Sequence, residues 1–216
     1  MRKENKRGFW IAGILLSAFA LWTVLVCVAD VRAIGPNGSC VGFATFNGFV
    51  HALTGTNFSL YVITDWLGLV PIGVVCGFAL LGLLQWIKRR SVLLVDRSLL
   101  ILGAFYLAVA AVYVLFECVV INRRPVLIDG ILEASYPSST TVLVLCVMPT
   151  AILQCKERIK SVMCRRCAVG AMSVLIAFTV IGRVLSGVHW ASDIIGGILI
   201  SAGLVALYAA VASERN

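Results

Sequence analysis

Six long stretches of this chain contain no acidic or basic residue, and they limit its possible folds more than any other feature. They cover residues 8–29, 66–87, 98–116, 134–155, 167–182 and 194–213. A helix needs roughly 20 apolar residues to cross the hydrocarbon core of a bilayer, which is about 30 Å thick. The sequence therefore predicts an all-α, polytopic membrane protein.

We expect six transmembrane helices in one bundle, forming a single domain over residues 1–216. They are placed near 9–29, 60–87, 98–121, 138–154, 166–186 and 191–213. The 16-residue stretch reaches spanning length by continuing past Arg166 or Arg183, because long cations can extend to the interface or into a site. The chain is 61% hydrophobic and 13% charged, against about 45–50% and about 25% in soluble domains. This composition excludes a soluble enzyme.

Two N-terminal features need separate interpretation. The first span follows four basic residues and could be a secretory signal, but its apolar run is long for a cleaved signal, which favours a retained anchor. Residues 30–58 are predicted to form an external loop. Within it, Phe43, Phe46 and Val50 recur at spacings of three and four, which predicts a short interfacial helix over 43–53.

The basic residues predict the orientation. With a cytoplasmic N-terminus, fourteen of the 18 lie inside, as the positive-inside rule requires. This set is Arg2, Lys3, Lys6, Arg7, Lys88, Arg89, Arg90, Arg97, Lys156, Arg158, Lys160, Arg165, Arg166 and Arg215. The net charge of +8 thus reflects topology, and we expect membrane lipids rather than nucleic acid as partners. Four arginines remain outside: Arg32, Arg123, Arg124 and Arg183.

The outer junction of the last two helices carries Arg183, His189 and Asp193. If the last helix begins near His189, the histidine and Asp193 share one face, four residues apart. The carboxylate can then fix one imidazole nitrogen and leave the other as a nucleophile. Arg183 supplies a planar cation suited to an oxyanion. A His–Asp pair four apart is also a common surface feature.

Two further external segments add groups that favour anions. Arg123 and Arg124 stand beside Pro125 after the third helix. The fourth helix begins with Tyr-Pro-Ser-Ser-Thr-Thr over 136–141, and proline in a first turn leaves free N–H groups that attract anions. Each feature alone is also typical of an interfacial anchor or a helix cap. Their placement on one side predicts a phosphate site at the outer membrane face.

These residues resemble the signatures of the type-2 phosphatidate phosphatase (phosphatidic acid phosphatase) family, whose members are similar to vanadium haloperoxidases. The third signature matches at Arg183, His189 and Asp193, the first ends at Arg124-Pro125, and the second begins at Pro137-Ser138. The matching region covers about 117–198. The resemblance implies a six-helix lipid phosphatase with an external site.

This chain departs from the family pattern at four positions. Glu117 stands where the family has lysine, Ser139 where it has glycine, and Thr140 where it has the histidine that acts as general acid. Gly182 replaces the serine before the third signature's arginine. A threonine hydroxyl cannot donate a proton usefully at neutral pH. Glu117 is an alternative acid if burial raises its pKa.

The resemblance implies a metal-independent reaction without a cofactor, in which His189 attacks phosphorus to form a phosphohistidine and Asp193 orients it. The phosphoryl oxygens would be held by Arg124, Arg183 and the amides of Ser138 and Ser139, with Arg123 supplying the missing cation. Because the general acid is lost, a lipid diphosphate such as a polyprenyl diphosphate is expected as substrate in preference to phosphatidate. The alternative is a silent relative that binds or carries an anionic lipid headgroup.

Two features stay outside this scheme. Asp65, near the start of the second span, is expected either to pair with Arg124 or Arg183 or to meet headgroup water. Cys164 and Cys167 have the spacing of a metal or redox motif, but one such pair is weak support, and no metal is expected. The predicted location is the plasma membrane, with both termini cytoplasmic and the site extracytoplasmic.

Overall fold

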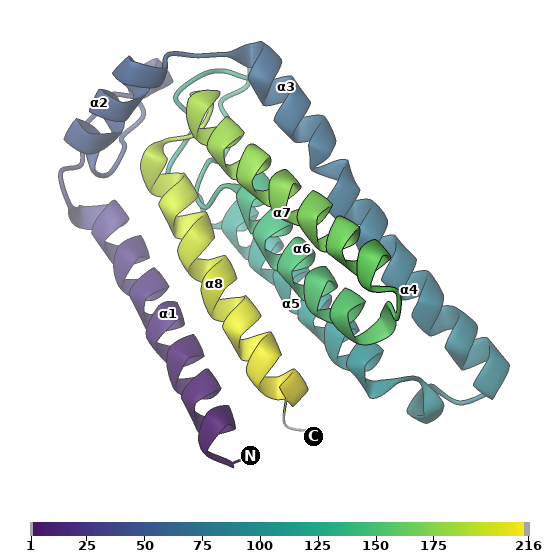
Figure 1. The fold of residues 1–216 in the computed structure, drawn as a ribbon. Helices are drawn as coiled ribbons and strands as arrows, with labels where there is room; N and C mark the ends of the chain where they lie inside the picture. The colour runs from purple at the N-terminus through teal and green to yellow at the C-terminus, as the bar shows by residue number, and fades with distance from the viewer. Residues whose placement is uncertain (1, 214–216) are drawn as a thin grey trace.

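The computed structural model describes residues 2–213, and helices dominate it (Figure 1). The helices are α1 (Arg2–Val28), α2 (Ala44–Thr54), α3 (Phe58–Leu67), α4 (Leu69–Arg89), α5 (Arg97–Cys118), α6 (Ser139–Arg158), α7 (Val162–Leu185) and α8 (Ala191–Ser213). Short 3₁₀ turns cover Pro36–Gly38 and Val92–Leu94. The all-α class is confirmed. Arg215, assigned above to the cytoplasmic end, lies outside the described residues.

Six segments of the described chain are long and apolar enough to cross a membrane, as predicted. The second, Phe58–Arg89, is two helices rather than one, because the regular helix is interrupted at Gly68 between α3 and α4. The Gly68 N–H donates to the carbonyls of Thr64 and Asp65, and a Cβ at Gly68 would lie 2.8 Å from the Asp65 carbonyl oxygen. The third span ends at Cys118 rather than near 121, where the backbone turns into the α5–α6 loop.

The helices surround α6 and α8, the two most buried spans. Helix α8 packs against α1 on one side and α6 on the other, and α7 packs against α6 and α3 (Figure 1). Gly196 of α8 permits one close contact, since a Cβ there would lie 2.5 Å from the Tyr136 ring. The Tyr136 hydroxyl hydrogen-bonds Thr23 of α1 at 2.7 Å. The start of α6 is thereby held between α1 and α8.

The helix predicted over 43–53 is present as α2, Ala44–Thr54. Phe46, Phe49 and Leu53 are exposed on it. Its buried polar residue, Asn47, donates to the Ser192 hydroxyl at 2.8 Å and accepts from the Ser192 N–H at 3.0 Å. Helix α2 therefore docks on the first turn of α8, directly beside the residues described below.

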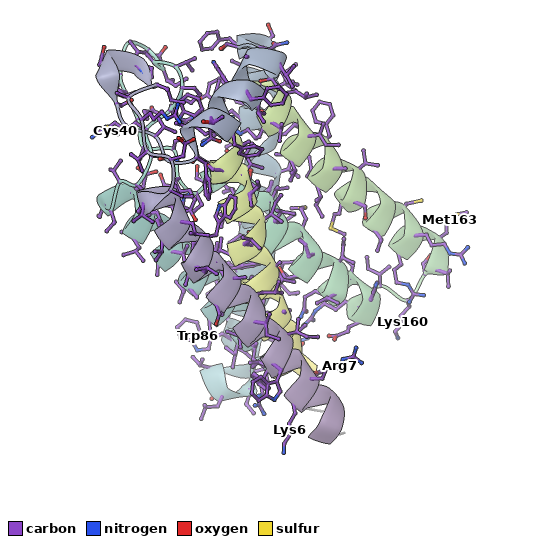
Figure 2. All side chains as sticks on the ribbon, turned by 90° about the vertical axis from the view of Figure 1, so that its left-hand side faces the viewer. Lys6, Arg7, Cys40, Trp86, Lys160 and Met163 are labelled. Carbon is purple, nitrogen blue, oxygen red and sulfur yellow. The ribbon has the colours of Figure 1, made fainter. Side chains whose placement is uncertain are left out.

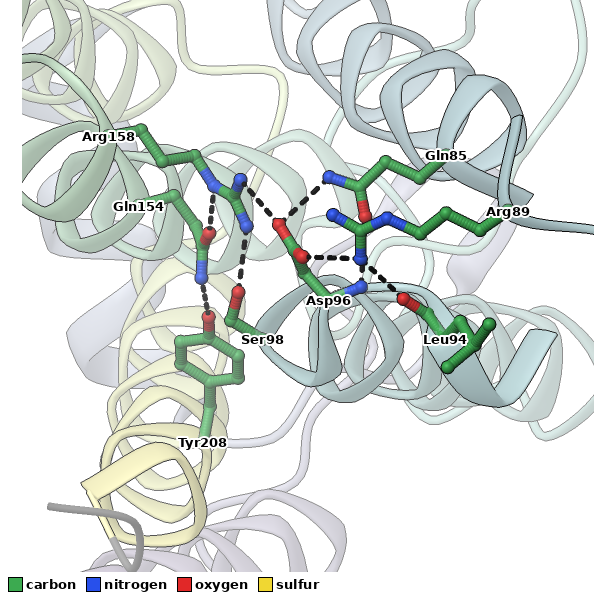
Figure 3. Close-up of polar contacts among 8 residues, drawn as sticks. All are labelled: Gln85, Arg89, Leu94, Asp96, Ser98, Gln154, Arg158 and Tyr208. Carbon is green, nitrogen blue, oxygen red and sulfur yellow. Dashed lines mark hydrogen bonds and ion pairs between the residues drawn. The ribbon is translucent and has the colours of Figure 1, made fainter. Parts of the chain in front are cut away.

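A polar cluster joins four helices at the end that holds both termini (Figure 3). The Asp96 carboxylate accepts from Gln85 at 2.8 Å, from Arg89 at 3.0 Å and from Arg158 at 3.3 Å. Gln154 accepts from Arg158 and donates to Tyr208 of α8. These bonds, with that from Gln85 first among them, hold the pKa of Asp96 below its ordinary value. The cluster ties together α4, α5, α6 and α8 opposite the candidate site.

The two ends of the bundle differ in charge. Figure 2 places Lys6, Arg7 and Lys160 at one end and Cys40 near the other. The α5–α6 loop and the α7–α8 junction lie at the Cys40 end, together with α2 (Figure 1). The residues assigned to the site thus sit opposite the basic end, while the orientation in a membrane stays a prediction.

Candidate active site

Four segments meet at the end of the bundle that carries α2. They are α3, the α5–α6 loop, the first turn of α6 and the α7–α8 junction. The loop is folded back on itself, because Arg124 N–H donates to the Glu133 carbonyl at 3.1 Å and Ser135 N–H donates to the Asn122 carbonyl at 2.9 Å. This closure brings Arg124 and Ser135 to the same place as His189.

Arg183, in the last turn of α7, is held by groups from two other helices. It is 1% exposed. Its Nη2 donates to Asp65 of α3 at 2.8 Å and to the Thr140 hydroxyl of α6. Arg124 and Arg183 were the two predicted partners of Asp65, and the structure shows that Asp65 pairs with Arg183. Its Nε and Nη1 are buried without a hydrogen-bond partner among the described residues, and such donors are costly unless a ligand satisfies them.

Gly182 explains how α3 reaches Arg183. A Cβ at this position would lie 2.6 Å from the Thr64 side-chain methyl, closer than packed atoms allow. The family's serine would push the two helices apart here. Glycine permits the close approach of α3 and α7 that carries the Asp65–Arg183 ion pair.

Arg124 lies close to Arg183 and His189. Its Nη1 is 3.4 Å from His189 Nε2, and its Nε is 3.0 Å from Glu133 Oε2. The Tyr61 ring of α3 lies under both guanidinium groups, with centroid distances of 5.8 Å to Arg124 and 5.0 Å to Arg183. A ring quadrupole attracts cations, so Tyr61 helps to hold two like charges near each other.

Asp193 does not contact His189 directly, which corrects the geometry expected from their spacing. Helix α8 begins at Ala191, after the histidine. The Asp193 carboxylate turns back and accepts from the Trp190 N–H at 3.1 Å, as an N3 acid does in a capping box. The Ser135 hydroxyl fills the space between, 3.0 Å from His189 Nδ1 and 2.5 Å from Asp193 Oδ2.

His189 is 4% exposed, and its surroundings oppose a positive charge. Burial first, and then the charges of Arg124 and Arg183, hold the pKa of His189 well below its ordinary range. The ring is therefore neutral at neutral pH. A neutral imidazole keeps a lone pair on one nitrogen, as a nucleophile requires.

The remaining predicted residues fall into two groups. Thr140, Ser139 and Glu117 line one cavity with His189. Arg123 turns away, since its guanidinium donates to the Leu132 carbonyl at 2.9 Å and the side chain is exposed. The Ser138 N–H, expected to hold phosphate, donates to the Asp193 carbonyl at 3.2 Å. The structure thus brings Arg124 and Arg183 to His189 but leaves Arg123 outside.

The cavity extends from His189 between α4, α5 and α6. Its volume is about 440 Å³. Ser135, Thr140, Glu117 and His189 line it together with apolar side chains such as Ile72, Val109 and Leu143. A mostly apolar cavity with a few polar groups at one end suits a ligand with a polar head and an apolar chain.

Sequence reasoning missed four residues of this site. They are Tyr61, Asn122, Glu133 and Ser135. Asn122 donates to Asp193 Oδ1 at 2.9 Å, and the other three are described above. Ser135 stands three residues before Ser138, in the uncharged stretch 134–155 but ahead of the span predicted near 138–154. Its only signal was the nearness to the second signature. Within residues 2–213, no group of three or more His, Cys, Asp or Glu side chains is placed to bind a metal ion.

Comparisons with known proteins give a family match for part of the chain and a similar fold for the whole of it. Residues 121–216 match the PAP2 superfamily. The whole fold is similar to the crystal structure of a transmembrane PAP2 type phosphatidylglycerolphosphate phosphatase from Bacillus subtilis, with a TM-score of 0.61 and 19% identity over 96% of this chain and 98% of that one. A search of curated proteins finds no match. The resemblance expected from the signatures is confirmed over residues 121–216, and the membrane-protein fold is confirmed for the described chain.

Proposed function

We propose that this chain, whose residues 121–216 form a PAP2 superfamily region, is an integral membrane phosphatase for a lipid phosphate or a polyprenyl diphosphate. The reaction takes place at the extracytoplasmic face, through a phosphohistidine on His189. The similar Bacillus subtilis fold supports the general class. The residues around His189 support the reaction.

The observation that carries the proposal is the unsatisfied Arg183 beside a neutral histidine. Arg183 is 1% exposed and has two buried nitrogens without a partner among the described residues. Arg124 stands on the other side, 3.4 Å from His189 Nε2. Each guanidinium group can bind two phosphoryl oxygens in bidentate geometry. An anion placed between them would meet the histidine nitrogen.

The chemistry follows from this placement. His189 Nε2 attacks phosphorus, an N–P bond forms, and the P–O bond to the leaving group breaks with its electron pair on oxygen. Arg124 and Arg183 stabilise the charge that gathers on the phosphoryl oxygens. Water then attacks the phosphorus of the phosphohistidine and releases phosphate, which restores the neutral imidazole.

The apolar cavity supports a lipid substrate. It joins the His189 end to the region between α4, α5 and α6, and its lining is mainly apolar. A lipid whose phosphate reaches His189 can place part of its chain there.

The leaving group favours a diphosphate. The Thr140 hydroxyl is engaged by Arg183 and cannot act as a general acid, a role worth about 10²–10⁴-fold when the leaving group is poor. A diphosphate expels a phosphate monoester, which is far more acidic than an alcohol and needs less protonation. We therefore place polyprenyl diphosphates ahead of phosphatidate.

A second function, headgroup binding without hydrolysis, has one observation in its favour. Both arginines of the site already form an ion pair with a carboxylate: Arg183 with Asp65 at 2.8 Å and Arg124 with Glu133 at 3.0 Å. These pairs lower the net positive charge available to a phosphate. A lipid-binding protein without turnover would tolerate this, together with the missing general acid.

Phosphate release separates the two functions. The protein purified in detergent is given polyprenyl diphosphate, phosphatidate and phosphatidylglycerophosphate in parallel, with His189→Ala as the control. We expect release from the diphosphate that is lost in the control. Release that persists in His189→Ala contradicts the proposed nucleophile, and binding without release from any substrate favours the silent relative.

Thr140→His tests the leaving-group argument. An imidazole at this position can protonate an alcohol, so hydrolysis of phosphatidate should rise relative to hydrolysis of the diphosphate by about 10²-fold. Thr140→Asn is the matched control, because it offers Arg183 an acceptor but no titratable proton. An equal rise for both substrates would contradict the proposed preference.

A further inference from the structure

Ser135 occupies a position that the reaction described above does not yet use. It is 3% exposed and lies in the α5–α6 loop, outside every residue assigned from the signatures. Its hydroxyl is 3.0 Å from His189 Nδ1 and 2.5 Å from Asp193 Oδ2. One hydroxyl therefore touches both groups, which do not touch each other.

The direction of each hydrogen bond follows from what the end groups can do. A guanidinium only donates, so the Arg124 contact at 3.4 Å requires His189 Nε2 to be the acceptor. The proton of the neutral ring is then on Nδ1, which donates to Ser135. A serine hydroxyl has a single proton, and this proton goes to the Asp193 carboxylate. The three groups form one chain that ends on a lone pair at Nε2.

We propose that Ser135 is a positioning residue that links Asp193 to His189 and fixes the histidine tautomer with its nucleophilic nitrogen toward the arginines. This inference rests on the phosphatase function proposed above. When Nε2 bonds to phosphorus, the ring becomes positively charged while the proton stays on Nδ1. That charge is met by Asp193 through the polarised Ser135 hydroxyl.

Asp193 has enough other hydrogen-bond donors that Ser135 is needed for the orientation of His189 rather than to satisfy the carboxylate. Asp193 also accepts from Asn122 at 2.9 Å, from the Trp190 N–H at 3.1 Å and from Ser192 at 3.4 Å. The carboxylate would remain well satisfied without Ser135. The imidazole would lose its connection to a negative charge, while Arg124 and Arg183 would still face it.

A double-mutant cycle tests the link. Ser135→Ala should lower kcat by about 10²-fold, the lower end of what a correctly held base contributes, with KM little changed because both arginines remain. Asp193→Asn should lower kcat strongly in the parent protein but add little in Ser135→Ala, since groups that act as a unit are non-additive. Independent, multiplying effects would overturn the proposal.

A second measurement does not depend on activity. The chain has two histidines, so His51→Gln leaves ¹⁵N-labelled His189 as the only signal in detergent. We expect a proton on Nδ1 in the otherwise unchanged protein. In Ser135→Ala we expect a lower imidazole pKa, because the hydroxyl link to Asp193 is lost while Arg124, Arg183, the backbone of residue 135 and the cavity residue Glu117 all remain. Ser192→Ala, which also removes a donor to Asp193, should shift this pKa less.

The two proposals fail in different ways. No phosphate release from the parent protein, with the Nδ1 tautomer present, removes the phosphatase function and leaves the Ser135 link standing. Normal release with a proton on Nε2 in the parent protein, or with the His189 pKa unmoved in Ser135→Ala, removes the link and leaves the function.

Discussion

The proposed reaction needs His189 to be both neutral and correctly oriented, and different neighbouring residues provide these two properties. Burial and two arginines disfavour the charged imidazolium, and the contact from Arg124 requires an acceptor at Nε2. Ser135 and Asp193 hold the ring from the other side. A carboxylate in direct contact would favour the charged imidazolium more strongly, so the interposed hydroxyl supplies orientation at a smaller cost in proton affinity.

The pH dependence of kcat/KM should report this balance. Protonated His189 has no lone pair to attack phosphorus, so activity is lost as pH falls through the pKa of the free enzyme. Because that pKa lies well below the ordinary histidine range, the acid limb should lie below about pH 6.5, the value for an unperturbed histidine. Initial rates at low substrate concentration over a pH series measure it.

Arg124→Gln supplies the comparison. Removing one of the two cations that disfavour the imidazolium should move the acid limb to higher pH, even though substrate binding weakens. An acid limb at or above the ordinary histidine value in the parent protein, or no movement in the variant, would contradict the proposed electrostatics of His189.

At the scale of elements, the site depends on how closely α3 approaches α7. Thr64 is fully buried, and its hydroxyl donates to the Leu60 and Tyr61 carbonyls at 2.9 Å. Its methyl lies 2.6 Å from the position that a Cβ of residue 182 would take. This contact sets the distance between the helices that carry Asp65 and Arg183, so helix packing determines the position of the arginine proposed to bind phosphate.

Gly182→Ala and Thr64→Ser form a test of that contact. Gly182→Ala should lower the free energy of unfolding by about 1–3 kcal/mol, because the new Cβ overpacks the interface. Thr64→Ser removes the methyl but keeps the hydroxyl, so the double variant should recover most of the loss. Denaturant unfolding in detergent measures the four proteins. Simple addition of the two single losses would show that the helices do not meet as described.

The helices themselves could be predicted because the bilayer imposes their length. Charges such as Arg97 and Lys156 stop an apolar run wherever they stand, and each of the six spans was located in this way. The interruption at Gly68 could not be predicted, since it depends on a hydrogen bond from its N–H to Asp65 and on the nearby Thr140 side chain. The sequence is equally apolar on both sides of Gly68.

Only some residues of the candidate site could be predicted from the sequence. Arg124, Arg183 and His189 belong to signatures with fixed spacing, and the fold brings them together. Ser135 and Glu133 reach them through the closure of a loop, which has no periodic pattern. The His189–Asp193 contact was predicted from helical spacing and was wrong, because α8 starts after His189 and Asp193 caps it.

At the scale of the whole molecule, the basic residues and the candidate active site lie at opposite ends of the bundle. The basic residues Lys6, Arg7 and Lys160 lie at one end of the bundle (Figure 2), and the Asp96 cluster lies at the same end. The α7–α8 junction, which contains His189, lies at the other end with α2 (Figure 1). Short loops rich in Lys and Arg stay on the cytoplasmic side of a membrane. The site is therefore expected to face away from the cytoplasm, toward lipid phosphates of the outer leaflet.

Cysteine labelling can test this orientation, since exposed cysteines stand at both ends. Cys40 lies in the loop before α2, and Cys167 lies in the first turns of α7. A variant that keeps only Cys40 should react with a membrane-impermeant maleimide on intact cells. A variant that keeps only Cys167 should react only after the cells are permeabilised. The reverse pattern would place His189 in the cytoplasm, and it would then require a reason why the basic end is translocated against the usual charge rule.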